Sequence, residues 1–293
     1  MKPVDFDYAA PERIEEALAL LRIWNAGAKI LAGGQSLLPL LVTRSLRPDF
    51  VIDINRIQAL DFIEQRGSGV AIGATVRQAK AERSDIIRSR CPLLAEALYW
   101  VAVPQIRSRG TVIGSLAQRN AISQIPTVAV VTGARLTVID KDRRQRVVDA
   151  EMFLNSDDPE TLKPHELVTE AWFPEQGPGS AWAFTEVQKR QAHYALVGVA
   201  VTFDYDDDGK IAAPRVAASG ISNRPVRLRS VEAALQGKVP TEKSFADASQ
   251  LSLEDSAMMP FSDVHATAEY RKEVTPVVIM RALRRAAARQ SRG

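Results

Sequence analysis

The sequence of 293 residues contains only one cysteine and three histidines. The lone Cys91 cannot form an internal disulfide, and it excludes a self-contained iron–sulfur cluster or a cysteine-rich zinc site. His165, His193 and His265 are scattered and form no HExxH motif, so no histidine-based metal centre is expected. Cys91 directly precedes Pro92, between two helical patterns, and we interpret it as a small buried core residue.

Long hydrophobic runs are also absent. The best one, YALVGVAVTF at 194–203, is well short of the run of about 18 residues that a membrane-spanning helix needs. The N-terminal residues show no basic segment followed by an apolar one, as a secretion signal would. With 46% hydrophobic and 25% charged residues, the composition is that of an ordinary globular protein. We therefore expect no membrane span and a cytoplasmic location.

The positive charge of the chain is concentrated at its C-terminal end. The net charge is +3, but residues 281–293 contain five arginines and no acidic residue, and without them the balance is 33 − 35 = −2. A nucleic-acid-binding surface normally has aromatic residues among its cations, and this segment has none. We interpret it as a solvated helix end, where cations are favoured by the helix dipole, and we expect no nucleic-acid partner.

The hydrophobic pattern indicates two regions of different organisation. In the first region we predict helices at 11–25, at 75–102 with a break near Pro92, and at 123–134, strands at 29–32, 50–54 and 166–173, and hairpins at 61–74 and 135–150. Residues 174–180, rich in glycine and proline, are the best linker candidate. Three strands then follow, with an acidic hairpin tip at 204–208, before helices at 225–237, 244–251 and 265–290. This order predicts a separate α+β domain.

The sharpest local motif is AGGQS at 32–36. A strand stops at Gly33 and Gly34, and Gln35 and Ser36 then open a helical segment. Adjacent glycines can turn their backbone N–H groups to one side as an anion-binding nest, and a serine hydroxyl can add a donor. The segment matches neither GxGxxG nor GxxxxGK[ST], which excludes a Rossmann motif and a P-loop. Taken alone, paired glycines more often mark a tight turn.

A second glycine motif, RGTVIGS at 109–115, resembles the first in composition. Gly110 and Gly114 flank an apolar step, with Thr111 and Ser115 as hydroxyl donors, ahead of the buried helix. Two such loops can supply neutral donors to one diphosphate from different directions. Neither loop contains lysine, which favours a diphosphate that stays bound over one that is transferred. No GxSxG motif is present, and we expect no catalytic residue in this chain.

Several blocks, in order, resemble one family over nearly the whole chain. They are the opening KPVDFDYAAPERIEEALALL, AGGQSLLPLL at 32–41, RPDFVIDINRI at 47–57, RSRGTVIGSLA at 107–117 and EYRKEVTPVVIMRAL at 269–283. The chain resembles the FAD-binding medium subunit of the molybdenum hydroxylase family, which includes the medium subunit of carbon monoxide dehydrogenase and the flavin domain of xanthine dehydrogenase.

The resemblance implies an α+β fold in two domains. An FAD-binding domain of the vanillyl-alcohol-oxidase/cresol-hydroxylase type is expected at 1–176, with lobes at about 1–57 and 58–176, and a three-stranded sheet with helices at 177–293. The implied cofactor is FAD, and no metal is expected. Its implied contacts are Ala32, Gly33, Gly34, Gln35, Ser36, Leu37, Thr111, Val112, Ile113, Gly114, Ser115, Asn120, Gln124, Leu167 and Thr185.

The resemblance also implies a function and partners. FAD would accept electrons from iron–sulfur clusters in a small partner subunit and pass them to an external acceptor, while a large molybdopterin subunit hydroxylates the substrate. The sequence departs from the family pattern at certain positions, where Ile113 replaces a glycine, Asn120 and Gln124 replace carboxylates, Thr185 replaces lysine or glutamate, and His193 replaces aspartate. These departures leave an alternative open, a flavin-less scaffold of the same fold that docks partner chains.

Overall fold

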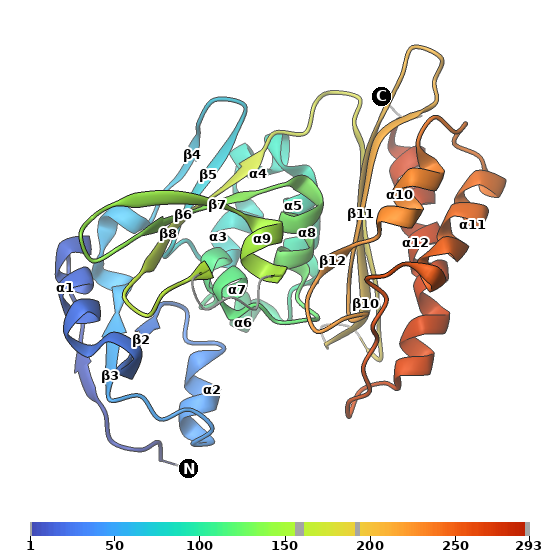
Figure 1. Cartoon of the computed structure of the whole chain (residues 1–293). Coiled ribbons are helices and arrows are strands. Elements are labelled where there is room, and N and C mark those ends of the chain that lie inside the picture. Colours follow the sequence, from blue (N-terminus) through green and yellow to red (C-terminus); the bar gives the residue numbers. More distant parts are fainter. Residues whose placement is uncertain (1, 156–160, 191–193, 291–293) are drawn as a thin grey trace.

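The protein contains three β-sheets with helices packed around them (Figure 1). The computed structural model describes residues 2–155, 161–190 and 194–290. The first sheet is small and parallel, in the order β1 (Asp7–Ala9), β3 (Phe50–Asp53) and β2 (Ala28–Leu31). Helix α1 (Ile14–Trp24) packs its apolar side on this sheet, and Trp24 stacks on Phe50 with ring centroids 4.9 Å apart. The predicted helix therefore starts three residues after Pro11, and β1 was not predicted.

The second sheet is antiparallel throughout, and both predicted hairpins are confirmed within it. Its order is β4 (Ile63–Gln65), β5 (Gly69–Gly73), β8 (Leu167–Pro174), β6 (Arg135–Ile139) and β7 (Gln145–Asp149). The associated helices are α2 (Leu37–Val42), α3 (Gln78–Arg83), α4 (Asp85–Arg90), α5 (Pro92–Trp100), α6 (Pro104–Arg107), α7 (Val112–Gln118), α8 (Gln124–Thr132) and α9 (Ala150–Asn155). Short 3-10 turns lie at Asn25–Gly27, Ile54–Arg56 and Gln58–Leu60. The predicted buried helix is α8, which ends at Gly133 with a φ of 72°.

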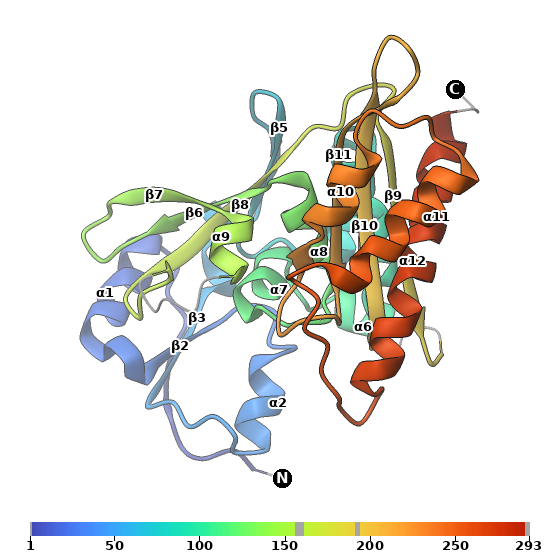
Figure 2. The same ribbon diagram turned by 45° about the vertical axis from the view of Figure 1, so that its right-hand side comes forward.

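The third sheet follows residues 174–180. Its strands β9 (Ala181–Gln188), β10 (Ala195–Tyr205) and β11 (Ile211–Ser219) are antiparallel, and the two-residue strand β12 (Val226–Arg227) adds to its edge. The remaining helices are α10 (Arg229–Leu235), α11 (Glu242–Gln250), the 3-10 turn Leu251–Glu254 and α12 (Ala268–Gln290). Figure 2 shows α10, α11 and α12 on one face of this sheet, with α8 behind the other. The third sheet therefore has the three predicted strands plus a short fourth one.

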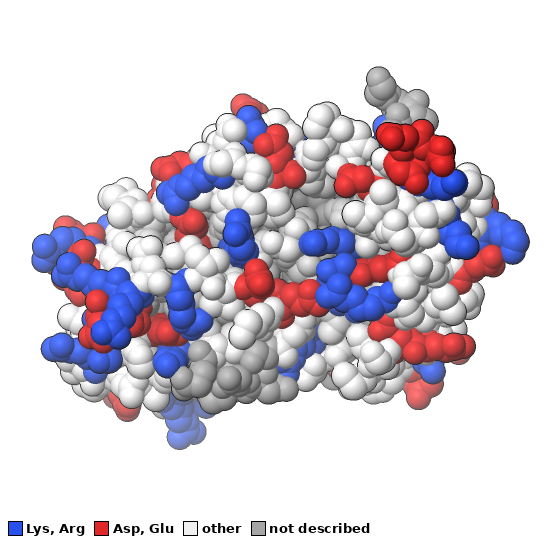
Figure 3. Space-filling model, turned by 45° about the horizontal axis from the view of Figure 1, so that its top comes forward, with Lys and Arg blue, Asp and Glu red and all other residues white. Residues whose placement is uncertain are grey.

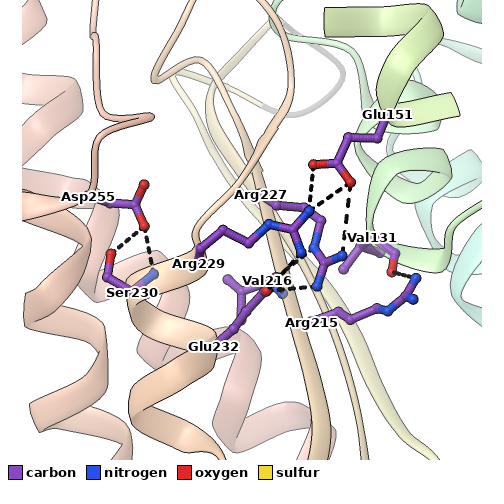
Figure 4. A network of polar contacts seen from close by, with 9 residues as sticks. All are labelled: Val131, Glu151, Arg215, Val216, Arg227, Arg229, Ser230, Glu232 and Asp255. Atoms are coloured by element: carbon purple, nitrogen blue, oxygen red, sulfur yellow. Dashed lines mark hydrogen bonds and ion pairs between the residues drawn. The ribbon is translucent and has the colours of Figure 1, made fainter.

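Ion pairs connect the C-terminal sheet to the N-terminal part of the chain (Figure 4). Glu151 of α9 accepts hydrogen bonds from Arg229 at 2.8 and 3.0 Å and lies 3.9 Å from an Arg227 nitrogen. Glu232 pairs with Arg227 at 2.7 Å and also accepts from the Val216 amide at 2.9 Å. Both carboxylate oxygens of Glu151 and of Glu232 therefore have partners, and for the buried Arg227–Glu232 pair these partners offset the cost of burying charge.

The C-terminal helix end is solvated, as predicted, and three of its arginines also form ion pairs that the sequence did not predict. Arg285 and Arg289 of α12 both form ion pairs with Glu96 of α5, and Arg284 pairs with Glu242. The Arg289 guanidinium also stacks over the Trp182 ring at 3.6 Å. The reason is tertiary, because α12 packs along β9 and brings these arginines to acids far away in the sequence.

Three smaller predictions can be compared with the fold. Cys91 is buried and has a free thiol, as predicted. The acidic segment forms the turn between β10 and β11, where Asp206 accepts hydrogen bonds from the Asp208 and Lys210 amides. Within the described residues, no group of three or more His, Cys, Asp or Glu side chains could hold a metal ion. No described helix is both long and apolar enough to cross a membrane.

Candidate cofactor site

The two glycine loops lie directly against each other. A Cβ atom built on Gly33 would lie 2.5 Å from the Arg109 carbonyl oxygen, 2.7 Å from the Gly110 Cα and 2.9 Å from the Thr111 nitrogen. Real Cβ atoms do not approach other atoms this closely, so only glycine allows the two backbones to meet here. The fold thus brings together two segments that are separated in the sequence by five α-helices, strand β3 and the β4–β5 hairpin.

The first loop is shaped by its glycines and leaves its hydroxyl exposed. Gly34 has a φ of 72°, a left-handed conformation that favours glycine. The Gln35 amide donates to the Gly33 carbonyl at 3.2 Å, which closes the turn. Ser36 is exposed at the start of α2 and makes no capping bond to that helix. Its hydroxyl can therefore donate to a ligand. Leu37, the first residue of α2, is half-buried.

The second loop begins its own short helix. Thr111 caps α7, since its hydroxyl oxygen accepts from the Gly114 amide at 2.9 Å. The sequence predicts only the later buried helix after this loop and not α7, because a helix of seven residues leaves too short a pattern. The hydroxyl proton of Thr111 can still be donated to a ligand. Ser115, which follows Gly114 in α7, is half-buried.

Ile113 does not project between the loops. Its side chain, like that of Val112, is buried in the larger hydrophobic core, and Ile113 is 4% exposed. The extra carbon atoms that distinguish it from glycine therefore pack inside the protein. This placement removes the strongest sequence argument for a damaged cofactor site.

Gln124, one of the predicted cofactor contacts, forms a hydrogen bond to a residue that the sequence did not single out, Glu186. Gln124, at the start of α8, donates from its amide to the Glu186 carboxylate at 3.0 Å and lies 3.4 Å from the Trp100 carbonyl. The Gln188 amide donates to the other Glu186 oxygen. Burial raises the pKa of Glu186 to about 7, although both amide hydrogen bonds act in the opposite direction.

Thr185 lies on the opposite face of β9 from Glu186. Side chains alternate along a strand, and Ala183 and Val187 pack against the C-terminal helices, whereas Phe184 belongs to the larger core. Thr185 shares the face of Ala183 and Val187. The residue that faces Gln124 is therefore Glu186, and a contact of Thr185 with the cofactor stays a prediction.

A cavity of about 610 Å³ opens beside this carboxylate. It is lined by Tyr99, Trp100, Ala102, Pro104, Arg107, Glu186, Gln188 and Arg190. The chain that forms one wall runs through α6 directly into the second glycine loop. Arg107 holds this wall, because it pairs with Glu82 at 2.9 Å and donates to the Val101 and Ala102 carbonyls. Aromatic walls with a polar edge suit a planar ring that carries hydrogen-bonding groups.

The remaining positions that the sequence singled out are Asn120, Leu167 and His193. Asn120 is exposed, and its side-chain oxygen accepts from the Ile122 amide at 3.0 Å in a local turn. Leu167 is buried at the start of β8 beside Ile139. His193 lies outside the described residues.

Two sets of residues at the site were missed by the sequence reading. Gln78 donates its backbone amide to the Gly110 carbonyl at 2.8 Å and its side-chain amide to the Thr111 carbonyl at 3.3 Å. Asn55 and Arg77 connect the two loops, as described below. The sequence carries no signal for these contacts, because they depend on how two separate sheets are packed together.

A backbone cradle between two glycine loops, with an aromatic, polar-edged cavity close by, defines a dinucleotide-cofactor protein of the α+β class. Comparison with known proteins then specifies the family. The model of the FAD-binding domain in molybdopterin dehydrogenases matches residues 4–176, and the model of the CO dehydrogenase flavoprotein C-terminal domain matches residues 182–286. The chain belongs to the family of FAD-binding medium subunits of molybdenum hydroxylases.

Relatives and solved structures agree with this assignment. The chain is 35% identical to 6-hydroxypseudooxynicotine dehydrogenase complex subunit alpha of Paenarthrobacter nicotinovorans, over 98% of this chain and 96% of the relative. It is 36% identical to caffeine dehydrogenase subunit beta of a Pseudomonas species, over 99% and 97% of the two chains. The structure superposes on carbon monoxide dehydrogenase from Hydrogenophaga pseudoflava with a TM-score of 0.92 and 32% identity, covering 99% of each chain.

These matches confirm the predicted fold, family and cofactor. The chain is a subunit of an oxidoreductase, and its cofactor is FAD. Its relatives are named as subunits of larger enzymes. The residues present fit FAD, because the close contact at Gly33 brings the two glycine loops and their hydroxyl groups together, and the cavity beside Glu186 is large enough for a system of three fused rings.

Proposed function

We propose that this chain carries electrons from iron–sulfur clusters in a small partner subunit, through FAD, to an external acceptor. The observation that carries the proposal is the contact of the two glycine loops, which creates a backbone cradle in a chain whose relatives are dehydrogenase subunits. The single cysteine, Cys91, is buried, so clusters and molybdenum must belong to other chains. The partners are a small iron–sulfur subunit and a large molybdopterin subunit that acts on the substrate.

We assign the diphosphate of FAD to the two loops. The residues that would surround it are Ala32, Gly33, Gly34, Gln35, Ser36, Leu37, Thr111, Val112, Ile113, Gly114 and Ser115. The backbone N–H groups of Val112, Gly114 and Ser115 already donate within the protein, so the donors would be other N–H groups of these loops and the hydroxyls of the serines and Thr111. The ring would lie in the cavity beside Glu186, with Gln124 behind that carboxylate. Asn120 and Leu167 stay predictions for the ribityl and ring surroundings.

Each group has a defined task in this arrangement. Bound FAD supplies the chemistry, since a flavin can exchange electrons singly or in pairs. The chain orients the cofactor through the cradle and shields its ring with Trp100 and Tyr99. Glu186 can hold a proton at its carboxylate near neutral pH. No acid–base residue for substrate hydroxylation is needed here, because that reaction belongs to the large subunit.

The organisation of the chain completes the proposal. We assign residues 1–176 to an FAD-binding domain with lobes at about 1–57 and 58–176, and residues 177–293 to a C-terminal domain. The two matched family models divide the chain close to this boundary, which supports the assignment. A cytoplasmic location also belongs to the proposal. The identity of the external acceptor is tested directly by the following experiment.

The test uses the complex of this chain with its partner subunits. Gly33→Ala places a methyl group on the Arg109 carbonyl, whereas Gly177→Ala, in the segment before β9, has only Ser180 at 3.5 Å and serves as the matched control. After chemical reduction of the clusters, electron delivery to NAD⁺, a soluble quinone and oxygen is measured. We expect the Gly33 variant to assemble without flavin, keep reduced clusters and lose delivery. Full delivery by a flavin-free complex would refute the proposal.

A further inference from the structure

Three hydrogen bonds in series connect the two glycine loops. The Asn55 side-chain amide donates to the Ala32 carbonyl of the first loop at 2.8 Å. The Asn55 side-chain oxygen accepts from an Arg77 nitrogen at 2.6 Å. The other terminal nitrogen of Arg77 donates to the Arg109 carbonyl, the same oxygen that lies against Gly33. Asn55 follows the small parallel sheet and Arg77 follows β5, so this series of bonds joins the two sheets.

The orientation of Asn55 is fixed by its neighbours. One Asp53 oxygen accepts both the backbone amide of Asn55, at 2.9 Å, and its side-chain amide. The other Asp53 oxygen accepts from the Tyr8 hydroxyl at 2.8 Å. Because Asp53 and Ala32 both require a donor, the NH₂ group of Asn55 must face them, and its oxygen must face Arg77. The pair is therefore set in one geometry.

The positive charge of Arg77 is not neutralised by a close acid. Its terminal nitrogens contact two neutral oxygens, and among the described residues neither Arg77 nor Arg109 forms an ion pair within 4.0 Å. Burial lowers the pKa of Arg77, and the nearby Arg109 cation lowers it further, while Asp53 and Asp61 act in the opposite direction. Asp61 is itself paired with Lys80 at 2.8 Å. An anion bound beside Arg77 and Arg109 would reduce the repulsion between their positive charges.

We propose that Arg77, held by Asn55, is a positioning residue for FAD that fixes the spacing of the two loops and supplies positive charge to the diphosphate bound beside their contact. The proposal rests on the assignment of the diphosphate to these loops. It also explains how a site without lysine in either loop attracts a doubly charged group. The guanidinium suits both tasks, because its planar fork can bind two fixed oxygens at once while its charge remains.

The two tasks can be separated by substitution. Arg77→Lys keeps the charge but cannot bridge two oxygens, Arg77→Gln loses both, and Asn55→Ala keeps the charge but frees the guanidinium. Arg215→Gln is the matched control, since Arg215 is also half-buried and contacts a neutral carbonyl, that of Val131, in another region. The FAD dissociation constant of the full chain is measured by flavin fluorescence at several salt concentrations, together with the melting temperature.

We expect Arg77→Gln to weaken FAD binding about 10- to 100-fold, in line with the loss of charge-assisted hydrogen bonds. It should also flatten the dependence of affinity on salt, because one cation fewer acts on the diphosphate. Arg77→Lys and Asn55→Ala should weaken binding while the salt dependence stays at the wild-type slope. Combining Asn55→Ala with Arg77→Gln should add little to Arg77→Gln alone, since both break the same series of bonds.

The result that overturns the inference is an Arg77→Gln variant whose FAD affinity and salt slope equal those of Arg215→Gln. Equal losses of affinity and melting temperature in both variants, with an unchanged slope, would likewise reduce Arg77 to a structural role. If Arg77→Gln does not fold, the FAD affinities of Arg77→Lys and Asn55→Ala decide, and affinities equal to that of Arg215→Gln in both variants would overturn the inference. A wild-type chain that fails to bind FAD would instead refute the proposed function, so the two failures are distinguishable.

Discussion

The Cα of Gly33 rests against the carbonyl oxygen of Arg109, with no space for even a methyl group between the two loops. This contact joins a turn after a parallel strand to a turn before a short helix. We therefore expect substitutions of Gly33 and Ile113, at or near this contact, to lower the stability of the protein.

Gly33→Ala should damage both binding and folding. The added methyl group would force the two backbones apart, and overpacking of this kind costs about 1–3 kcal/mol of stability. Because the same displacement widens the cradle, we expect FAD affinity to fall by more than the melting temperature suggests. Flavin content after purification and denaturant unfolding measure the two effects. Retention of stoichiometric FAD would show that the loops are not part of the cofactor site.

Ile113→Gly should lower stability without improving FAD binding. The side chain of Ile113 is buried in the core, and its removal, together with a glycine inside α7, should cost about 4 kcal/mol. A flavin-less scaffold damaged at this position would instead gain affinity when the glycine is restored. Fluorescence titration with FAD on Ile113→Gly and on the milder Ile113→Val distinguishes the two, and a gain of affinity would favour the scaffold.

Glu186 should make stability depend on pH near neutrality. Its pKa is raised by burial to about 7, from about 4.3 in an unfolded chain, so the folded state holds the proton more tightly. The contribution is complete below about pH 4, falls as pH rises and is lost above about pH 7, an effect of about 4 kcal/mol.

Glu186→Gln should therefore remove this slope and be more stable than wild type at pH 8, but not at pH 5. Urea unfolding across this range, at fixed FAD concentration, measures the difference. The exposed Glu254→Gln is the control and should leave the pH profile unchanged. A Glu186→Gln profile that parallels wild type would mean that this carboxylate stays ionised in the folded protein.

Cys91 should be chemically inert in the native state. Burial raises the pKa of its thiol to about 12, so almost no thiolate exists at pH 8, and the thiolate is the reactive form. We expect iodoacetamide to modify the unfolded chain within minutes and the native chain only at the rate of unfolding. Intact-mass spectrometry with and without urea provides the measurement. Rapid alkylation in the absence of urea would contradict the buried placement.

Much of the fold could be predicted because its signals are local. The hairpin around Gly67 and Gly69, the apolar helix ending at Gly133 and the break before Pro92 each depend on residues close together in the sequence. Both glycine loops could be found for the same reason. Strand β1 could not, since three residues carry too little pattern to distinguish a strand from a loop.

The polar contacts of the site were harder to predict, because they depend on tertiary packing. Sequence alone gives the alternation along β9 but not which face meets α8, so the contact between Glu186 and Gln124 could not be predicted. Asn55 and Arg77 became visible only once two sheets were placed together. Ile113 is the converse case, where a departure from the expected glycine proved to be a core contact.

The pairing of the α12 arginines affects how the protein behaves on an ion exchanger. An isoelectric point near 9.0 suggests firm retention on a sulfonate resin at neutral pH. However, Arg284, Arg285 and Arg289 are matched by Glu242 and Glu96, and Figure 3 shows cations and acids interspersed over one face of the molecule. A resin responds to local field more than to total charge. The chain should therefore elute at lower salt than its composition implies.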